Sequence, residues 1–332
     1  MQYLRGYRDA VNNLYAALTG TAPALAEVAA APGFADNAQF TWGLQATRVN
    51  QSRSTGRGIR IAVLDTGMDL AHPDFAGRTI THQSFISGED VQDGNRFGHG
   101  THCIGTALGP SIPVSSVRRC GCATAGNIFA GKVLSNAGSG ADAGILAGIN
   151  WAITNRCRII SMSLGAPVRP GETFSPIYEG VAQRALEANP GTLIIAATGN
   201  SSRGSDGLRR EPPNPVSRPA NCPSILAVAA VDANLAIAPF SDGGINPNGG
   251  GVDIAGPGVN VFSSIPVNRG THGPLNGTSM ATPHVAGIAG MWLEARGTDT
   301  SAHALWQLLT GNALRLTLSS RDVGAGLVQA PV

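Results

Sequence analysis

Short apolar runs that alternate with helical patterns limit the fold of this chain more than any other feature of its sequence. From Ile59 onward, five runs are almost continuous in apolar residues. They are IRIAVLD at 59–65, NIFAGKVL at 127–134, RIISMSLG at 158–165, GTLIIAATGN at 191–200 and SILAVAAVD at 224–232. Strands that are buried on both faces have this pattern, because each face meets an apolar layer. The runs therefore predict the parallel strands of a buried sheet.

Segments with helical spacing lie between and after these runs. They cover residues 99–108, 141–155, 178–188, 279–296 and 301–311. Strands that alternate with helices favour right-handed crossovers, which place helices on both faces of a sheet. The predicted fold class is α/β, a three-layer α/β/α sandwich around a twisted, mainly parallel sheet. Ligands of such sheets bind beyond the carboxyl ends of the strands, so we expect functional side chains there.

The N-terminal part of the chain differs from the rest in composition. Residues 1–19 have the spacing of an amphipathic helix, and an Ala- and Pro-rich linker follows at 21–33. We expect a helical extension and linker at 1–38 and one large α/β domain at 39–332. We also expect the helix to pack on that domain, the alternative being a partly disordered tail.

Charge and hydropathy exclude several classes of partner. The chain of 332 residues has 23 basic and 21 acidic residues, a net charge of +2, and no Lys/Arg run stands out. Neither nucleic acid nor a membrane is therefore an expected partner, and we expect a monomer. The start of the chain lacks the layout of a secretory signal. The protein is expected to be secreted or extracellular if it is cut from a longer precursor, and cytoplasmic otherwise.

The five cysteines are an odd number, so at least one thiol is unpaired or pairs between chains. Cys120 and Cys122 have no second Cys or His pair at zinc-finger spacing, which disfavours a structural zinc site. The positions do not indicate which cysteines pair, and buried small apolar side chains are the ordinary explanation for four of them, Cys120, Cys122, Cys157 and Cys222.

Polar side chains stand at several predicted strand ends. Asp65 ends the first strand, His99 lies between two glycines, and Asn200 ends the strand at 191–200. Each has an ordinary structural explanation, as a turn former or a structural histidine. Ser279 opens the last long helical pattern, where serine is a common N-cap. Pro283 removes the N–H that would bond to the Ser279 carbonyl, and broken local rules are commonest at functional sites.

The combination of these residues favours chemistry over structure. The chain order Asp65, His99, Ser279 is the order in which subtilisin carries its Asp, His and Ser triad. The flanking motifs are AVLDTGMDLAHPDF, GHGTHCIGT, SMSLG, AATGN and NGTSMATPHVAG. In these motifs the chain resembles the subtilisin-like serine proteases, the subtilase or peptidase S8 family, over roughly residues 40–330. HGTHC is most similar to the proteinase K branch.

The resemblance implies a serine endopeptidase that hydrolyses peptide bonds through an acyl-enzyme on Ser279. His99 would be the general base and then the general acid, and Asp65 would orient it. Asn200 and the backbone N–H of Ser279 would hold the oxyanion. His102, one helical turn after His99, also fits the base role, and only the resemblance selects His99.

The resemblance also implies a cleft for an extended polypeptide, which is held by β-augmentation. Its two edges would be Gly138, Ser139 and Gly140, and Ser163, Leu164 and Gly165. Ala197, Thr198 and Gly199 would form an uncharged wall of the pocket for the residue before the cut bond (P1), with its floor within 214–219. We therefore expect broad specificity with a large apolar P1 residue, and an inhibitory pro-segment is a further expected partner.

No cofactor is expected for catalysis, but the resemblance implies structural calcium. Asp253 and the carbonyls of Pro223 and Ile225 resemble a cation site of the proteinase K type, although Asp253 also fits a turn cap. Asp74 matches a ligand of another calcium site of the family, but GPSIPVSSVRRCGC replaces the loop that should supply its partners. Cys103 resembles the free thiol beside the histidine of proteinase K-like enzymes, which implies inhibition by mercurials.

Other functions fit the sequence less well. An inactive subtilisin-like scaffold that binds a partner through its cleft is the main alternative, but all four catalytic positions carry the expected residue types. An α/β-hydrolase is disfavoured because G-x-S-x-G is absent and its triad has another order. The Ser–Glu–Asp relatives of subtilisin do not use a histidine in the HGTH manner.

Overall fold

The structure is a computed structural model that describes residues 33–114, 117–169, 171–244 and 249–332. One compact unit runs from Phe34 to Val332, and the account below concerns this unit. The helix predicted at 1–19 and nearly all of the linker predicted at 21–33 lie outside the described residues. The predicted division at 38/39 therefore stays a prediction.

A seven-stranded sheet forms the centre of the unit, in the order β2-β3-β1-β4-β5-β6-β7. All neighbouring strands in it are parallel. The strands are β1 Arg60–Asp65, β2 Ile80–Ser84, β3 Asn127–Lys132, β4 Ile159–Met162, β5 Leu193–Ala197, β6 Leu226–Val231 and β7 Ile254–Pro257. The strand order reverses between β1 and β4, so this sheet offers a ligand crevice beyond the carboxyl ends of these two strands.

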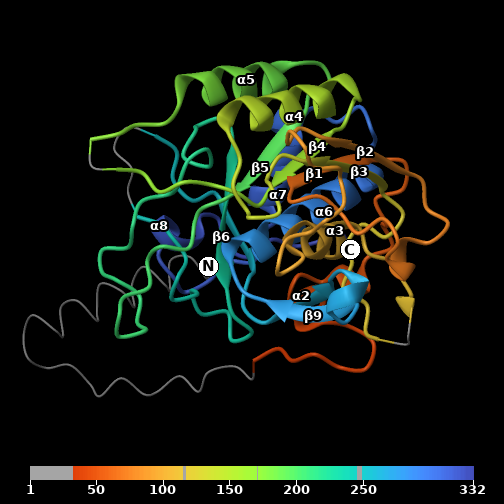
Figure 1. Cartoon of the computed structure of the whole chain (residues 1–332). Helices are drawn as coiled ribbons and strands as arrows, with labels where there is room; N and C mark the ends of the chain where they lie inside the picture. Colours follow the sequence, from red (N-terminus) through yellow and green to blue (C-terminus); the bar gives the residue numbers. More distant parts are fainter. Residues whose placement is uncertain (1–32, 115–116, 170, 245–248) are drawn as a thin grey trace, which may run out of the picture. The chain divides into compact units, whose positions relative to one another are not determined.

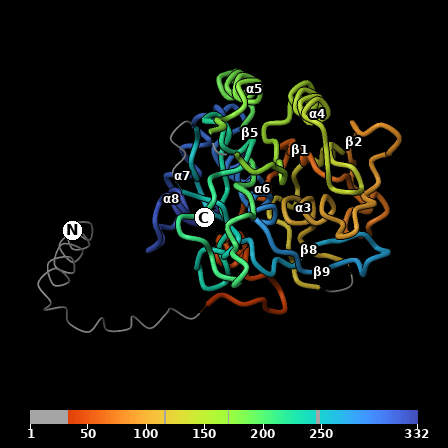
Figure 2. The backbone as a smooth tube through the Cα atoms, turned by 60° about the vertical axis from the view of Figure 1, so that its left-hand side comes forward, coloured from red at the N-terminus to blue at the C-terminus, as the bar shows by residue number. Residues whose placement is uncertain are grey.

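Helices cover both faces of the sheet (Figure 1). On one face lie α4 Asp142–Thr154 and α5 Pro176–Glu187. On the other lie α3 His99–Leu108, α6 Thr278–Arg296 and α7 Ala302–Gly311. The turned view keeps α4 and α5 together on one side and α3 and α6 on the other (Figure 2). The predicted three-layer sandwich is confirmed.

The side chains of β1 show why the strands read as continuous apolar runs. Ile61 and Val63 belong to the buried cluster that includes residues of α3 and α6. Ala62 and Leu64 belong to the buried cluster that includes residues of α4 and α5. Both faces of β1 are therefore core, and no polar alternation remains in the sequence.

Shorter elements complete the unit. They are α2 Trp42–Ala46, η1 Val49–Gln51, η2 Pro73–Phe75, β8 Val261–Ser264, η4 Val267–Arg269, β9 His272–Leu275 and α8 Ser320–Val323. β8 and β9 pair as an antiparallel hairpin. Over the described part of the chain, we find no helix with the length and apolarity to cross a membrane.

Candidate active site

Asp65 and His99 are brought together by the end of β1 and the start of α3. His99 Nδ1 lies 2.7 Å from Asp65 Oδ1, and the backbone N–H of Thr66 donates to the same oxygen at 2.7 Å. The Asp65 side chain is 1% exposed and that of His99 23% exposed. Because the carboxylate accepts the Nδ1 proton, Nε2 of a neutral His99 carries the free lone pair.

A second set of hydrogen bonds fixes this strand end to the helix start. Thr66 Oγ1 donates to Asp93 Oδ1 at 2.9 Å and accepts from the Gly100 N–H at 2.9 Å. Asp93 also accepts from the Thr101 N–H at 2.8 Å. The turn after β1 and the start of α3 approach so closely that a Cβ on Gly100 would lie 2.2 Å from the Gly67 carbonyl oxygen. The position of His99 therefore depends on glycine next to it.

Burial and charge act in opposite directions on His99. Burial lowers the pKa of its imidazole, but the charge of Asp65 and the hydrogen bond to it raise that pKa well above 6.5. Cys103 Sγ lies 3.9 Å from His99 Nδ1 and 3.5 Å from the Ser279 carbonyl oxygen. Burial raises the pKa of Cys103 to about 11, so it is a neutral thiol at ordinary pH. The predicted inhibition by mercurials stays a prediction.

The competing histidine points away from the cleft. His102 is fully buried, and its Nε2 lies 2.9 Å from the Val261 carbonyl oxygen, to which it donates. Burial lowers the pKa of His102 to about 3, which keeps it neutral. His99, but not His102, lines the cavity described below.

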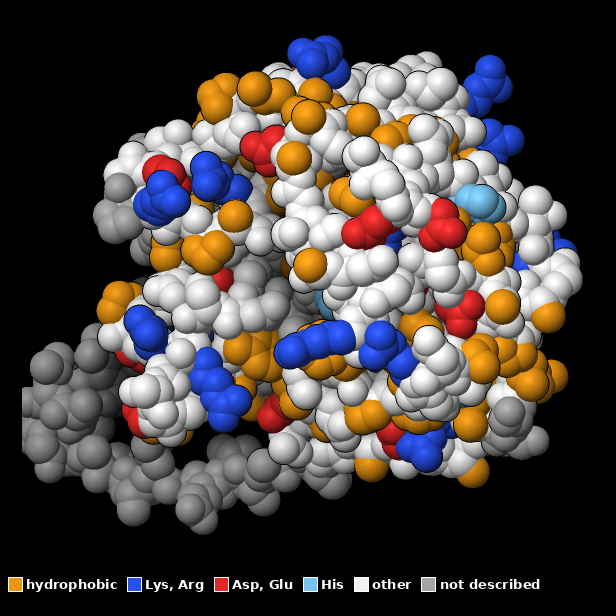
Figure 3. Space-filling view, viewed as in Figure 1, with side chains coloured by type: hydrophobic (Ala, Val, Ile, Leu, Met, Phe, Trp, Pro, Cys, Tyr) orange, Lys and Arg blue, Asp and Glu red, His pale blue; other side chains and the backbone are white. Residues whose placement is uncertain are grey.

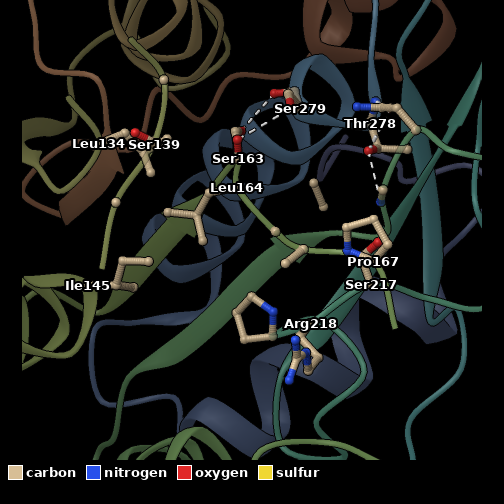
Figure 4. A pocket seen from close by; sticks show the side chains of 18 of the residues that line it. Leu134, Ser139, Ile145, Ser163, Leu164, Pro167, Ser217, Arg218, Thr278 and Ser279 are labelled. Carbon is tan, nitrogen blue, oxygen red and sulfur yellow. Dashed lines mark hydrogen bonds between the residues drawn. The ribbon is translucent and has the colours of Figure 1, made fainter. Parts of the chain in front are cut away.

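Ser279 is the second residue of α6 rather than its N-cap. The N-cap is Gly277, with φ 151° and ψ 160°. Pro283 lies inside the helix and cannot donate to the Ser279 carbonyl. That carbonyl oxygen accepts instead from Ser163 Oγ at 2.7 Å and from the Cys103 thiol. The irregular first turn thus ties α6 to the segment after β4 (Figure 4).

The Ser279 hydroxyl itself points toward Ser163 in this structure. Ser279 Oγ donates to the Ser163 carbonyl oxygen at 3.3 Å. Among the residues that the structure describes, no hydrogen bond joins Ser279 Oγ to His99. The long Ser279–Ser163 contact leaves this hydroxyl weakly held.

Asn200 is oriented through its side-chain oxygen. Its Oδ1 accepts from the Thr278 N–H at 2.8 Å and from Thr278 Oγ1 at 3.0 Å. A Cβ built on Gly277 would lie 3.5 Å from Asn200 Nδ2 and 3.5 Å from the Ser279 backbone nitrogen. Two N–H donors therefore border one point at the start of α6, where the helix dipole favours negative charge.

These groups open into one cavity of about 780 Å³. His99, Asn200 and Ser279 line it, and Asp65 lies behind His99. Every residue predicted to bind substrate lines the cavity except Thr198, which is fully buried. Figure 4 shows Leu134 and Ser139 on one side of Leu164, and Pro167 and Ser217 on the other. In the space-filling view the surface is hollowed near the centre of this face (Figure 3).

The cavity also contains residues that the sequence analysis did not predict. They include Phe97, Leu134, Ile145, Tyr178, Ser201 and Asp242. These residues lie outside the five motifs, and Asp242 is in a loop without helical or strand periodicity. Ser217, Arg218 and Pro219 line the cavity within the predicted floor segment.

Asp253 and Asp74 have different environments. Asp253 lies just before β7, and its Oδ2 accepts from the Ala227 N–H of β6 at 2.7 Å. Asp74 accepts from His272 Nε2 at 2.8 Å, Ser264 Oγ at 2.7 Å and the Val114 N–H at 2.9 Å. The Asp74 carboxylate is thus engaged by protein donors on both oxygens.

Known proteins similar to this chain are subtilisins. The model of the subtilase family matches residues 56–326. The chain is 39% identical over 295 residues to Subtilisin Savinase of Lederbergia lenta. The matched region covers 87% of this chain and 96% of Subtilisin Savinase. The chain is also 39% identical over 263 residues to Subtilisin E of Bacillus subtilis (strain 168). That matched region covers 78% of this chain and 61% of Subtilisin E.

A solved structure described as a cold adapted subtilisin-like serine proteinase has a TM-score of 0.71 and 28% identity. The alignment covers 89% of this chain and 99% of the chain in that structure. The protein is therefore a serine endopeptidase on a parallel α/β sheet, and its substrates are polypeptides. More particularly, the chain belongs to the subtilase family. The likeness to the proteinase K branch stays a prediction.

Proposed function

We propose that this enzyme cuts peptide bonds through an acyl-enzyme on Ser279, with His99, Asp65 and Asn200 in the roles predicted from the sequence. The observation that carries the proposal is the 2.7 Å Asp65–His99 contact behind a cavity that Ser279 and Asn200 also line. A base, a hydroxyl and two converging N–H donors are the parts that acyl transfer needs.

Each group has one task in the proposed reaction. The Ser279 hydroxyl leaves the Ser163 carbonyl, gives its proton to His99 Nε2 and attacks the scissile carbonyl carbon. Asp65 stabilises the imidazolium, while Asn200 Nδ2 and the Ser279 N–H donate to the oxyanion. His99 then protonates the leaving amine, and a water molecule activated by His99 releases the acyl group.

Hydrolysis of a fluorogenic Ala-Ala-Pro-Phe peptide tests this proposal directly. We expect turnover by the native chain and a loss on the order of 10⁶ in kcat for Ser279→Ala, the size of effect known for a subtilisin nucleophile. Ser205→Ala, at an exposed loop position, is the matched control and should keep full activity. Equal rates for Ser279→Ala and the native chain would contradict the assignment, and no turnover by either would favour the binding scaffold.

We also propose broad specificity with a large apolar P1 residue. Leu164, Ala166, Ala197 and Gly199 supply uncharged wall surface around the cavity. A series of peptides that differ only at P1 measures the preference. We expect Phe and Leu to be cleaved faster than Lys, Arg or Asp, and a preference for any of these three would overturn the proposal.

We further propose that Asp253 and the carbonyls of Pro223 and Ile225 hold a structural calcium ion. These residues are hard oxygen donors, and the Ala227–Asp253 hydrogen bond sets the Asp253 carboxylate beside the chain that leads into β6. We expect calcium to raise the melting temperature and EDTA to lower it, with both effects lost in Asp253→Asn. The same response in Asp253→Asn as in the native protein would remove this site.

We propose that the helix predicted at 1–19, tethered by the linker at 21–33, packs on the catalytic domain. If so, a chain without it should melt at a lower temperature or show altered activity, and identical behaviour would count against the idea. A role for an inhibitory pro-segment, a monomeric state and action outside the cell also stay predictions. Light scattering and the location of the activity in producing cells test the last two.

A further inference from the structure

The floor of the cavity contains a buried carboxylate that the triad chemistry does not use. Asp242 is fully buried and lines the cavity together with Ser217. Its carboxylate accepts from the Ser201 N–H at 2.9 Å, Ser201 Oγ at 2.8 Å and Ser202 Oγ at 2.7 Å. Ser217 Oγ is 3.4 Å from its Oδ2. All four partners are donors, which suits the ionised carboxylate.

The charge of Asp242 has no cationic partner in the described part of the chain. The two nearby arginines are engaged elsewhere: Arg218 pairs with Glu172 at 3.7 Å and Arg209 with Asp322 at 2.9 Å. A buried anion held only by neutral donors is costly, and a cation that enters its surroundings reduces that cost. The open cavity is the place from which such a cation can approach.

The carboxylate lies directly behind the proposed P1 wall. A Cβ built on Gly199 would lie 2.3 Å from Asp242 Oδ2 and 2.3 Å from Ser217 Oγ. The Asp242 N–H also donates to the Gly199 carbonyl oxygen at 3.0 Å. Asp242 is thus attached to the wall that precedes Asn200, and its negative charge lies next to Gly199 and Ser217, which both line the cavity.

We infer that Asp242 makes the P1 pocket selective for charge: it favours a P1 side chain with an apolar stem and a cationic or hydrogen-bond-donating tip, and it rejects acidic side chains. This inference rests on the proposed cleft. It compares P1 side chains of equal size, so an overall preference for Phe and Leu over Lys and Arg is compatible with it. The uncharged walls accept the stem of Lys, Arg or Tyr, while Ser217 faces its tip and the negative charge of Asp242 acts on the tip from behind the wall. Large apolar residues are still cut, but less well than partners of equal size that carry a donor.

Matched peptides separate charge from size. The pairs are Ala-Ala-Pro-X substrates with Lys against norleucine, Tyr against Phe, and Gln against Glu at P1. In the native enzyme we expect kcat/KM to be higher for the first member of each pair, by roughly tenfold where the tip is charged. In Asp242→Asn, which keeps the shape and removes the charge, the Lys–norleucine and Gln–Glu ratios should approach one.

Controls distinguish the buried charge from the general field. Glu172→Gln removes a partly exposed carboxylate near Arg218 and should leave all three ratios unchanged. An equal shift in Glu172→Gln and Asp242→Asn, or a native Lys–norleucine ratio below one, would overturn the inference. The Lys–norleucine ratio of the native enzyme can still overturn the inference if Asp242→Asn does not fold.

The proposed function fails separately, if Ser279→Ala cuts as fast as the native chain or if no peptide is cut. In the second case, binding of Ala-Ala-Pro-Lys and Ala-Ala-Pro-norleucine to the native chain still measures charge selection. Tighter binding of the lysine peptide supports the inference, and weaker binding contradicts it.

Discussion

Asn200 shows how one side chain becomes a directed donor. Its oxygen is held by two groups of Thr278, so the amide nitrogen is turned toward the Ser279 N–H. The side chain is exposed, yet both bonds to its oxygen come from the first residue of α6. Donors that are fixed before the reaction do not have to reorganise when negative charge develops.

Asn200→Ala should therefore lower kcat with little change in KM. Loss of one such donor in a subtilisin costs on the order of 10²–10³ in turnover, and we expect the same range here. Steady-state kinetics with the fluorogenic peptide give both constants, and Asn234→Ala, in a turn after β6, is the control. A rise in KM at unchanged kcat would show that Asn200 binds substrate instead.

As the proposed general base, His99 should set the acid limit of activity. Although burial lowers the pKa of this imidazole, Asp65 raises it well above 6.5, so His99 becomes protonated as the pH falls through that raised value. A protonated His99 cannot accept the Ser279 proton, and kcat/KM should fall on the acid side with a midpoint above pH 6.5. The residual activity of Asp65→Asn should have its midpoint at lower pH. A native midpoint below pH 6.5 would contradict the assignment.

At the level of elements, the site depends on how closely α3 approaches the turn after β1. A Cβ at position 100 would collide with the Gly67 carbonyl oxygen, so α3 can approach this turn only with glycine at position 100. The first turn of α6 is fixed in a comparable way, by Ser163 and Cys103. The two helix starts carry His99 and Ser279, so these local contacts determine how the two proposed catalytic side chains are placed.

Gly100→Ala should displace α3 and its first residue, His99. Alanine normally stabilises a helix interior by about 0.5–1 kcal/mol relative to glycine, but here the new Cβ meets backbone. We expect a lower melting temperature and a large fall in kcat. Gly180→Ala in α5, where the nearest atom is 3.5 Å away, is the matched control and should be neutral or stabilising. Equal behaviour of the two variants would refute the role of this contact.

The strands and helices also differ in how well they could be predicted from the sequence. The five predicted strands and five predicted helices are confirmed, because buried runs and helical spacing leave strong patterns. β2 was missed because its side chains are mostly exposed or half-buried, and β7 because it has four residues that include Gly and Pro. Asp242 was missed because contacts between distant loops, rather than local spacing, bring it to the cavity.

Across the whole molecule, Asp74 joins segments that are far apart in the chain. Its carboxylate connects η2 to Val114, to Ser264 of β8 and to His272 of β9. Burial raises the pKa of this carboxyl, but the hydrogen bonds from His272, Ser264 and Val114 outweigh burial and leave the pKa below 3.8. The β8–β9 hairpin is thereby fastened to the rest of the unit.

Asp74→Asn should lower the free energy of unfolding near pH 7 by about 1–3 kcal/mol, because buried donors lose their charged acceptor. Since the folded pKa lies below the unfolded value of 3.8, the stabilisation is present above that pH and disappears as the pH falls through the folded pKa. Urea unfolding of both proteins at neutral and acid pH measures this. A difference that is the same at both pH values would contradict the electrostatic origin.

The separation of the catalytic residues along the chain has a consequence for biosynthesis. Asp65 and His99 belong to the first strand and the first long helix of the described unit, whereas Ser279 belongs to α6, after all seven strands of the central sheet. A ribosome releases the N-terminal part first. If the proposed roles hold, the growing polypeptide has its acid and base long before its nucleophile, and a product that terminates before α6 would be inert. The order of the proposed triad along the chain would thus delay proteolytic activity until nearly the whole enzyme has been made.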